Sequence, residues 1–493
     1  MSLTPEEKGP VRKTSDGAPR ARPSSTTLSR FLSHYGMLGV LVLLAVFFSL
    51  VTLQEQPATG AAGARALLER FPERLAAPGA PQAILIVARA GEDDARFVSA
   101  LTAGLQARGY RDVTAVTGEP GEIRSGLTRW AETAAVTAAA TPAIATLQAY
   151  APVVRGVQET LPALAAAPLF TPHSFRWPTF LLTENLINVA NQIAVIAILA
   201  IGMTMVIVTG GIDLSVGSLI ALAAVIATGL VGQMGGTGAS GWAMVAAASA
   251  AILLSGGIGA FSGLVITRFR VPPFIATLGM MQVASGLAYI LSKGRPIYQL
   301  PESFVALGRG VDPLLGVPYA VLLMVVLYAA AHLLMARTPL GRYIYAVGGN
   351  AEAARLAGVA VRGVQMFVYI VSGLLAGLGG VVMASQLRSG APTYGIMYEL
   401  YVIAAVVVGG TSLNGGEGRI LGTLIGAFII AVIQNGMNLT NVESYTQKVV
   451  LGLVILGAVL LDRLRHAGWF WQRRGLRREA QGSPGDPHAG MET

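Results

Sequence analysis

The sequence contains no cysteine and few charged residues. Without cysteine, disulfides, thiol catalysis and cysteine-ligated metals are all excluded. No G-x-x-x-x-G-K-[ST] phosphate loop occurs, so the chain lacks the usual motif for binding ATP. Charged residues make up only 12% of the chain, whereas soluble proteins carry roughly 25%. The histidines are too scattered to suggest a metal site; they are His34, His173, His332, His466 and His488.

What the sequence does contain is apolar. Hydrophobic residues make up 53% of the chain and its mean hydropathy is +0.60, which indicates residence in a membrane. A membrane-spanning helix needs about 20 apolar residues, and ten segments reach or approach that length. The predicted fold is therefore an all-α polytopic membrane protein with about ten transmembrane helices. They are expected near 36–53, 188–208, 214–233, 241–265, 272–291, 318–335, 363–386, 398–410, 420–437 and 447–462, the eighth being short.

The charge distribution gives an orientation. The net charge is +9, and arginine is concentrated in both tails and in the segment 336–362. Basic segments beside spans are typical of the cytoplasmic side, and an even number of spans places both tails there. A nucleic-acid partner is not expected. The predicted domains are a basic cytoplasmic tail (1–35), a first transmembrane helix (36–54), an extracytoplasmic insert (55–181), a membrane core with about nine helices (182–463) and a second basic cytoplasmic tail (464–493).

The first span and the insert that follows it differ in character. The span also fits a cleaved signal peptide, but its 35-residue leader is long for that role, which favours an uncleaved anchor. The insert that follows has a soluble texture. Residues 83–90 and 112–118 predict strands, whereas 93–110 and 121–132 predict amphipathic helices. We expect a small α/β layer with a docking or spacer role, and 132–170 is helical or loosely ordered.

The stretch "VTGGIDLSVGS" (208–218) interrupts two long apolar runs. Gly210 and Gly211 can adopt positive φ, and Asp213 or Ser215 can accept hydrogen bonds from the free N–H groups that open the third span. The stretch is then a capped turn; alternatively, glycine-rich backbone at a membrane face lines a path or forms a hinge. A similar pattern of Gly-Gly between apolar helices recurs at 406–427, as an internal repeat or as a second turn of the same kind.

The long arginine-rich loop 336–363 contains a second candidate site. Asn350 can cap a short helix "AEAARLA" (351–357), and Gly358 can end it. Glu352 lies at the positive end of that helix dipole. So short a helix is marginal alone and needs something to pack against. Either it fits a partner's cleft, or it folds onto the membrane face.

Four motifs carry a family resemblance: "IGMTMVIVTGGIDLSVGSLIALAA", "VPPFIATLGMM", "TPLGRYIYAVGGNAEAARLAGV" and "VVVGGTSLNGGEG". Over roughly 180–465 the chain resembles the ribose/xylose-type permease subunits of bacterial ABC importers. The resemblance implies an inner-membrane subunit that carries a monosaccharide inward. It also implies an ABC ATP-binding subunit, a periplasmic sugar-binding protein, a permease homodimer or heterodimer, and membrane lipid around it. ATP would be used by the separate subunit, so no cofactor is expected. The large insert departs from the family's compact pattern.

The resemblance also assigns roles to residues. The transport-core motif comprises Gly210, Gly211, Asp213, Ser215 and Gly217. The segment that contacts the ATPase comprises Asn350, Glu352, Ala353, Ala354, Arg355 and Gly358. Polar residues inside otherwise apolar spans are candidates for lining the path, although at least half are expected to make only interhelical hydrogen bonds. These candidates are Asn191, Gln192, Thr204, Gln282, Gln434 and Asn435.

Three other function classes stay open at this point. The nearest is a related ABC permease for nucleosides or branched-chain amino acids. An ion-coupled secondary transporter usually carries ionisable groups within its spans, but the third to seventh spans contain only His332. A membrane enzyme or sensor would use the insert, which has no carboxylate pair, Ser/His set or histidine cluster. The residues therefore favour a transport subunit without enzymatic activity.

Overall fold

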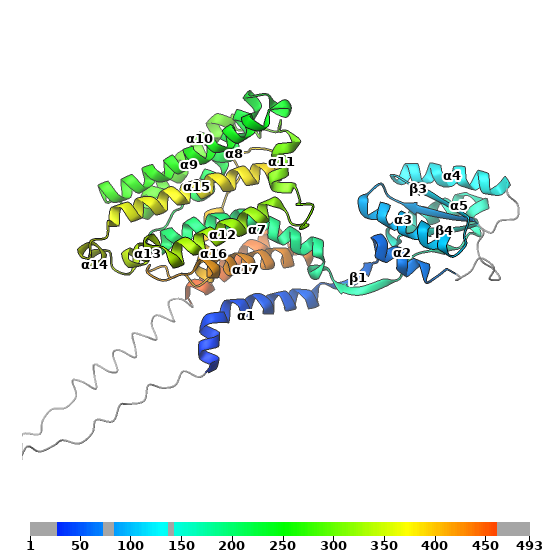
Figure 1. The fold of residues 1–493 in the computed structure, drawn as a ribbon, viewed down its shortest axis with the longest axis horizontal. Coiled ribbons are helices and arrows are strands. Elements are labelled where there is room, and N and C mark those ends of the chain that lie inside the picture. Colours follow the sequence, from blue (N-terminus) through cyan, green and yellow to red (C-terminus); the bar gives the residue numbers. More distant parts are fainter. Residues whose placement is uncertain (1–26, 72–82, 137–141, 461–493) are drawn as a thin grey trace, which may run out of the picture. The chain divides into compact units, whose positions relative to one another are not determined.

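The computed structural model describes residues 27–71, 83–136 and 142–460 (Figure 1). Its contacts divide the chain into two compact units. The first consists of 193–430 with the described residues of 1–44 and 451–493, and the second consists of 45–192 and 431–450.

Long apolar helices recur along the described chain. Seven helices among the described residues are long and apolar enough to cross a membrane: α7 (Thr183–Val208), α8 (Val216–Gln233), α9 (Gly241–Phe269), α10 (Pro273–Ser292), α12 (Tyr319–Arg337), α15 (Val361–Leu387) and α17 (Ile420–Leu439). Shorter apolar helices cover Gly36–Val51 within α1 (Thr27–Val51), α16 (Tyr398–Val408) and Ser444–Leu460. These helices coincide with the ten predicted segments and confirm the polytopic helical fold.

Glycines allow two helices of the first unit to pack closely. Helices α9 and α15 run side by side (Figure 1). A Cβ atom on Gly259 of α9 would collide with the carbonyl oxygen of Tyr369, and one on Gly373 of α15 would collide with that of Ser255. Close backbone approach through small residues is a common way for membrane helices to associate, because lipid provides no hydrophobic drive between them. The α9–α15 pair therefore depends on glycine at its crossing.

Short helices connect the spans of this unit. The 3-10 helix η3 (Gly236–Gly238) links α8 to α9, and α11 (Glu302–Arg309) precedes α12. Between α12 and α15 lie α13 (Pro339–Gly349) and α14 (Ala351–Leu356). The predicted short helix at 351–357 is therefore confirmed as a separate element, one residue shorter than expected.

The second unit contains a doubly wound α/β sheet. Parallel strands lie in the order β3 (Asp112–Thr117), β2 (Ala83–Ala88), β4 (Pro142–Thr146), β5 (Leu169–Phe170). Alternate residues of β2 enter two different cores, because successive side chains of a strand point to opposite faces. Ile84 and Ile86 pack with the helices α2 (Gly60–Leu68) and α3 (Glu92–Ala107). Leu85 and Val87 pack on the other face with α4 (Pro120–Val136), α5 (Ala151–Thr160) and α6 (Pro162–Ala165).

The α/β character of the insert is thus as expected, and the structure adds elements that the sequence left undecided. The predicted strand–helix–strand–helix run corresponds to β2, α3, β3 and α4. The segment 132–170 was expected to be helical or loose, yet it also supplies the strands β4 and β5 and the 3-10 helix η1 (Gln148–Tyr150). Strand β4 is short and lies in an alanine-rich region, so no alternation of polar and apolar residues marked it.

A two-stranded ribbon carries the chain into and out of this sheet. Strand β1 (Leu53–Pro57) pairs antiparallel with β6 (Ser174–Pro178). The 3-10 helix η2 (Thr179–Leu181) follows, and the Thr52 hydroxyl accepts a hydrogen bond from the Phe180 N–H at 3.1 Å. The two ends of the insert therefore lie beside each other.

Candidate functional site

The loop between α7 and α8 is held in one conformation by its glycines. Gly210 has φ +81, a left-handed conformation that glycine adopts without strain and that ends α7. Gly211 is needed for a different reason, since a Cβ atom there would collide with the Tyr369 hydroxyl. Gly217 in the first turn of α8 leaves room for the carbonyl oxygen of Gly395, which would lie 2.6 Å from a Cβ atom.

Asp213 ties this loop to α15. Its side chain is only 1% exposed. One carboxylate oxygen accepts hydrogen bonds from the Ser215 N–H at 3.0 Å and the Ser215 hydroxyl at 2.6 Å. The other accepts from the Ser372 hydroxyl of α15 at 2.7 Å. Burial raises the pKa of this carboxyl, which lies between two spans, and the three hydrogen bonds oppose the rise.

The predicted role of this loop as a simple helix cap is wrong in its geometry. Ser215 is the N-cap residue of α8, but its side chain accepts no hydrogen bond from the first turn of that helix. Asp213 accepts from the N–H of Ser215, which precedes the helix. The carboxylate is used for a contact with a distant helix, so its removal affects tertiary structure and not only the start of α8.

Both glycine-rich loops meet beside α13. The Gly416 N–H, between α16 and α17, donates to the Val208 carbonyl oxygen at the end of α7 over 2.8 Å. Gly348 of α13 packs at the same place, where a Cβ atom would collide with that carbonyl. The Tyr345 hydroxyl of α13 donates to the Gly418 carbonyl at 2.8 Å. The two similar motifs are therefore adjacent in space, and α13 contacts both.

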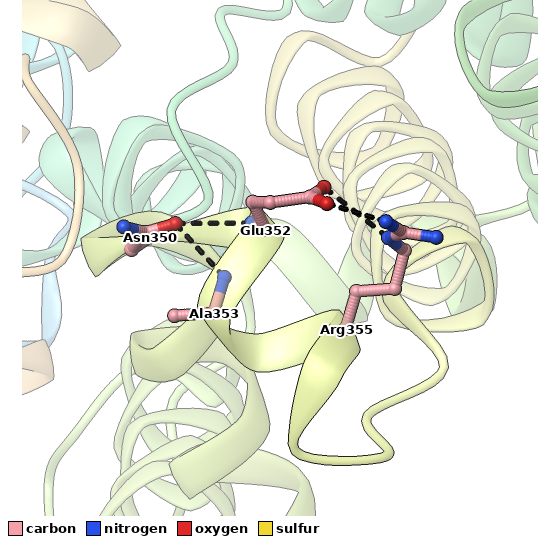
Figure 2. A network of polar contacts seen from close by, with 4 residues as sticks. All are labelled: Asn350, Glu352, Ala353 and Arg355. Carbon is pink, nitrogen blue, oxygen red and sulfur yellow. Dashed lines mark hydrogen bonds and ion pairs between the residues drawn. The ribbon is translucent and has the colours of Figure 1, made fainter.

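Helix α14 is short and has a defined start and end (Figure 2). The Asn350 side chain accepts hydrogen bonds from the N–H groups of Glu352 and Ala353, each at 3.0 Å, which confirms the predicted cap. Gly358, with φ +85, ends the helix as predicted. Glu352 and Arg355 form an exposed ion pair (Figure 2), which lowers the pKa of Glu352 and raises that of Arg355.

The two sides of α14 differ in exposure. Ala354 is buried, with 5% of its surface exposed, so its side chain lies on the inner side of the helix. Its predicted role in contacting the ATPase stays a prediction. Ala353 is exposed, and Leu356 is 80% exposed. A single exposed apolar side chain is ordinary on a protein surface, so a partner contact on this side of α14 stays a prediction.

A cavity of about 630 Å³ lies between α14 and the loops that contain these motifs. Gly210 of the α7–α8 loop, Arg270 of the α9–α10 loop, Glu352 and Arg355 of α14, and Arg362 of α15 are among its lining residues. We call it the arginine pocket. It adjoins both predicted sites, because it is lined by Gly210 of the transport-core motif and by Glu352 and Arg355 of the segment predicted to contact the ATPase.

Residues 185–459 match the family model "Branched-chain amino acid transport system / permease component", which covers more than half of the chain. The chain belongs to this family of transport permeases. It is therefore a multi-pass protein of the bacterial inner membrane, as its apolar helices require.

Several individual relatives are named as sugar permeases. The permease is 47% identical over 287 residues to "Ribose import permease protein RbsC" of Escherichia coli (strain K12), covering 58% of this chain and 87% of the relative. It is 44% identical over 292 residues to the protein of the same name from Bacillus subtilis (strain 168), covering 59% and 88%. It is 38% identical over 299 residues to "L-arabinose transport system permease protein AraH" of Escherichia coli (strain K12), covering 61% and 88%. No solved structure matches significantly. The resemblance inferred from the four motifs is confirmed.

The candidate path-lining residues of the permease are divided between the two units and differ in burial. In the first unit, the Thr204 hydroxyl is buried and shares a 2.8 Å hydrogen bond with Thr423, whereas Gln282 is exposed on α10. In the second, Asn435 exchanges two amide hydrogen bonds with Asn185, at 2.8 and 3.0 Å. Asn191 and Gln434 are half-buried there and Gln192 is exposed. Their role in lining a path stays a prediction.

Sequence reasoning missed several residues of the permease that the structure places at this site. They are Tyr345, Gly348, Leu356, Tyr369 and Ser372. The Tyr369 hydroxyl is buried without a hydrogen-bond partner in the described part of the chain. Ser372 could have been found from the sequence, since it is a polar residue that opens the small-residue run "SGLLAGLGG". The other four follow no local pattern.

Proposed function

We propose that the chain is the membrane-spanning subunit of an ATP-driven importer that carries a monosaccharide, most simply a pentose. The relatives named for ribose and L-arabinose support this proposal, because the chain covers 87% and 88% of their lengths at 47% and 38% identity. The cargo is thus inferred from several relatives along nearly their whole length. The family description names branched-chain amino acids instead, and leucine is the natural comparison in a transport assay.

The proposed assembly needs other subunits. The chain has no phosphate loop, so a separate ABC ATP-binding subunit would use the ATP. A periplasmic sugar-binding protein would deliver the cargo, and a second permease chain would complete the path. In the orientation that the basic residues predict, the arginine-rich loop and both tails are cytoplasmic, and the insert is extracytoplasmic. The exposed side of α14, with Ala353 and Leu356, then faces the ATPase.

The observation that supports coupling to an ATPase is the position of α14 in the chain between α13 and α15, which contact the end of α7 and the α7–α8 loop respectively. On one side, Gly348 of α13 packs against the carbonyl oxygen of Val208. On the other, Ser372 of α15 donates to Asp213. A displacement of α14 by the ATPase is therefore transmitted to both ends of that loop. Packed helices with two discrete arrangements are a physical basis for such coupling.

An experiment on the exposed side of α14 tests this proposal. Leu356→Asp replaces an exposed apolar contact with a charge and is expected to prevent co-purification of the ATPase and abolish uptake of labelled ribose or arabinose. Ala353→Trp adds bulk to the same side and should act similarly. Leu314→Asp is the matched control, since Leu314 is 90% exposed and lies outside this site; it should leave both properties unchanged.

Two results would contradict the proposal in different ways. Full ATPase binding and full uptake with Leu356→Asp would show that α14 is only a connector. Uptake of leucine but of neither pentose by the unmodified chain and its partners would refute the sugar assignment and leave the coupling role intact.

A further inference from the structure

The arginine pocket has a surplus of positive charge. Arg355 is paired with Glu352 within it. Arg270 and Arg362 also line it, and neither makes an ion pair or a side-chain hydrogen bond within the described ranges. Two guanidinium groups that face one cavity without a carboxylate partner are suited to an anion, because their planar forks bind phosphate in a bidentate manner.

The start of α15 adds to this preference for an anion. Val361, Arg362 and Gln365, from its first turns, all line the pocket. No side chain caps this 27-residue helix at Ala360, so the positive end of its dipole is not occupied by a capping group. The cavity volume of about 630 Å³ falls within the range of small-ligand sites, about 300–1,000 Å³.

The surroundings of the pocket point to a lipid. Arg270 lies between the candidate spans α9 and α10, so the pocket is at a membrane boundary. The residues that flank its lining segment 270–273 in the chain are apolar and exposed: Phe269 is 69% exposed, Phe274 50% and Ile275 55%. A dissolved anion would make no favourable contact with these apolar side chains, whereas the acyl chains of a lipid would pack against them. Basic pockets between spans are a known form of lipid recognition.

We propose that the arginine pocket binds the phosphate head group of an anionic phospholipid, with the acyl chains along Phe269, Phe274 and Ile275. Arg270 and Arg362 hold the phosphate, and the polar side chains of Thr267 and Gln365 are placed to contact the glycerol. Since Glu352 and Arg355 form another wall, the lipid head group would lie against α14 itself. This lipid binding needs neither ATP nor sugar, so it can be tested independently of the proposed function.

Native mass spectrometry of the purified full chain tests the proposal. Phosphatidylglycerol is titrated against phosphatidylcholine with the same acyl chains. We expect selective binding of one phosphatidylglycerol per chain. Each basic residue lost is expected to weaken binding about fivefold, so Arg270→Gln with Arg362→Gln should weaken it about 25-fold. Lysine at both positions keeps the charge but loses the bidentate forks, so it should restore only part of the binding.

A matched control removes the same charge elsewhere. Lys293→Gln with Arg295→Gln takes two positive charges from the opposite end of α10 and should leave the affinity within about twofold of the unmodified chain. Equal loss in both double variants would show general electrostatic attraction and overturn the assignment. Equal binding of phosphatidylcholine would overturn it too. Glycerol 1-phosphate or inorganic phosphate that displaces the lipid at equal concentration would assign the pocket to a soluble anion instead.

Discussion

The contact between Asp213 and Ser372 leads to a quantitative prediction about stability. Asp213→Ala removes three hydrogen bonds at once and leaves the hydroxyls of Ser215 and Ser372 without an acceptor in a buried place. Ser372→Ala removes only one of the three. If the carboxylate mainly ties the loop to α15, the two substitutions should be strongly coupled.

The expected magnitudes follow from hydrogen bonds in membranes. Interhelical hydrogen bonds in a membrane protein average about 0.6 kcal/mol and reach about 1.7 kcal/mol, and a bond to a carboxylate lies at the upper end. Ser372→Ala should therefore cost about 1–1.5 kcal/mol of unfolding free energy, and Asp213→Ala about 2–4 kcal/mol. With both substitutions present the cost should stay near that of Asp213→Ala alone, a coupling of about 1 kcal/mol.

Unfolding of the purified chain in detergent with increasing dodecyl sulfate measures these free energies. The double-mutant cycle separates the Asp213–Ser372 contact from the other effects of each substitution. Costs that add within about 0.3 kcal/mol would refute the contact as an energetic link. In that case the α7–α8 loop and α15 would be neighbours without mechanical coupling.

Two further predictions concern packing and orientation. Gly348→Ala should lower the free energy of unfolding by about 1–3 kcal/mol, because its Cβ atom would overpack against the Val208 carbonyl. A Cβ atom at Gly349 meets nothing within 4 Å, so Gly349→Ala should be neutral or slightly stabilising. Thermal unfolding compares the two variants, and equal effects would contradict the close approach at Gly348. In whole cells, an impermeant thiol reagent should label the exposed Ala90→Cys and not the exposed Ala353→Cys; the reverse pattern would invert the proposed topology.

The helices of this permease were predictable because each span requires a continuous apolar run, and such a run is visible without knowledge of its neighbours. The same holds for the ends of α14, since Asn350 and Gly358 act on backbone groups within three residues of themselves. Local chemistry of this kind is written in adjacent residues.

The contacts that organise the site were not predictable, because they join residues far apart in the chain. Nothing near Asp213 indicates that its partner is Ser372, 159 positions away. The orientation of α14 was hidden for another reason. Six residues are fewer than two turns, so periodicity could not show that Ala354 faces inward and Leu356 outward. Strand β4 was missed because tertiary burial, not a local pattern, stabilises it.

The β1–β6 ribbon makes the sheet domain a separable module of the chain. Because Leu53 pairs with Pro178 and Pro57 with Ser174, the chain leaves the sheet domain where it entered. A domain whose ends adjoin can be grafted into a loop, or excised from it, without separating the residues on either side. Replacing 58–173 with a two-residue hairpin turn should therefore leave a shorter chain that still inserts in the membrane, and the excised domain becomes a cassette that can be exchanged or studied by itself.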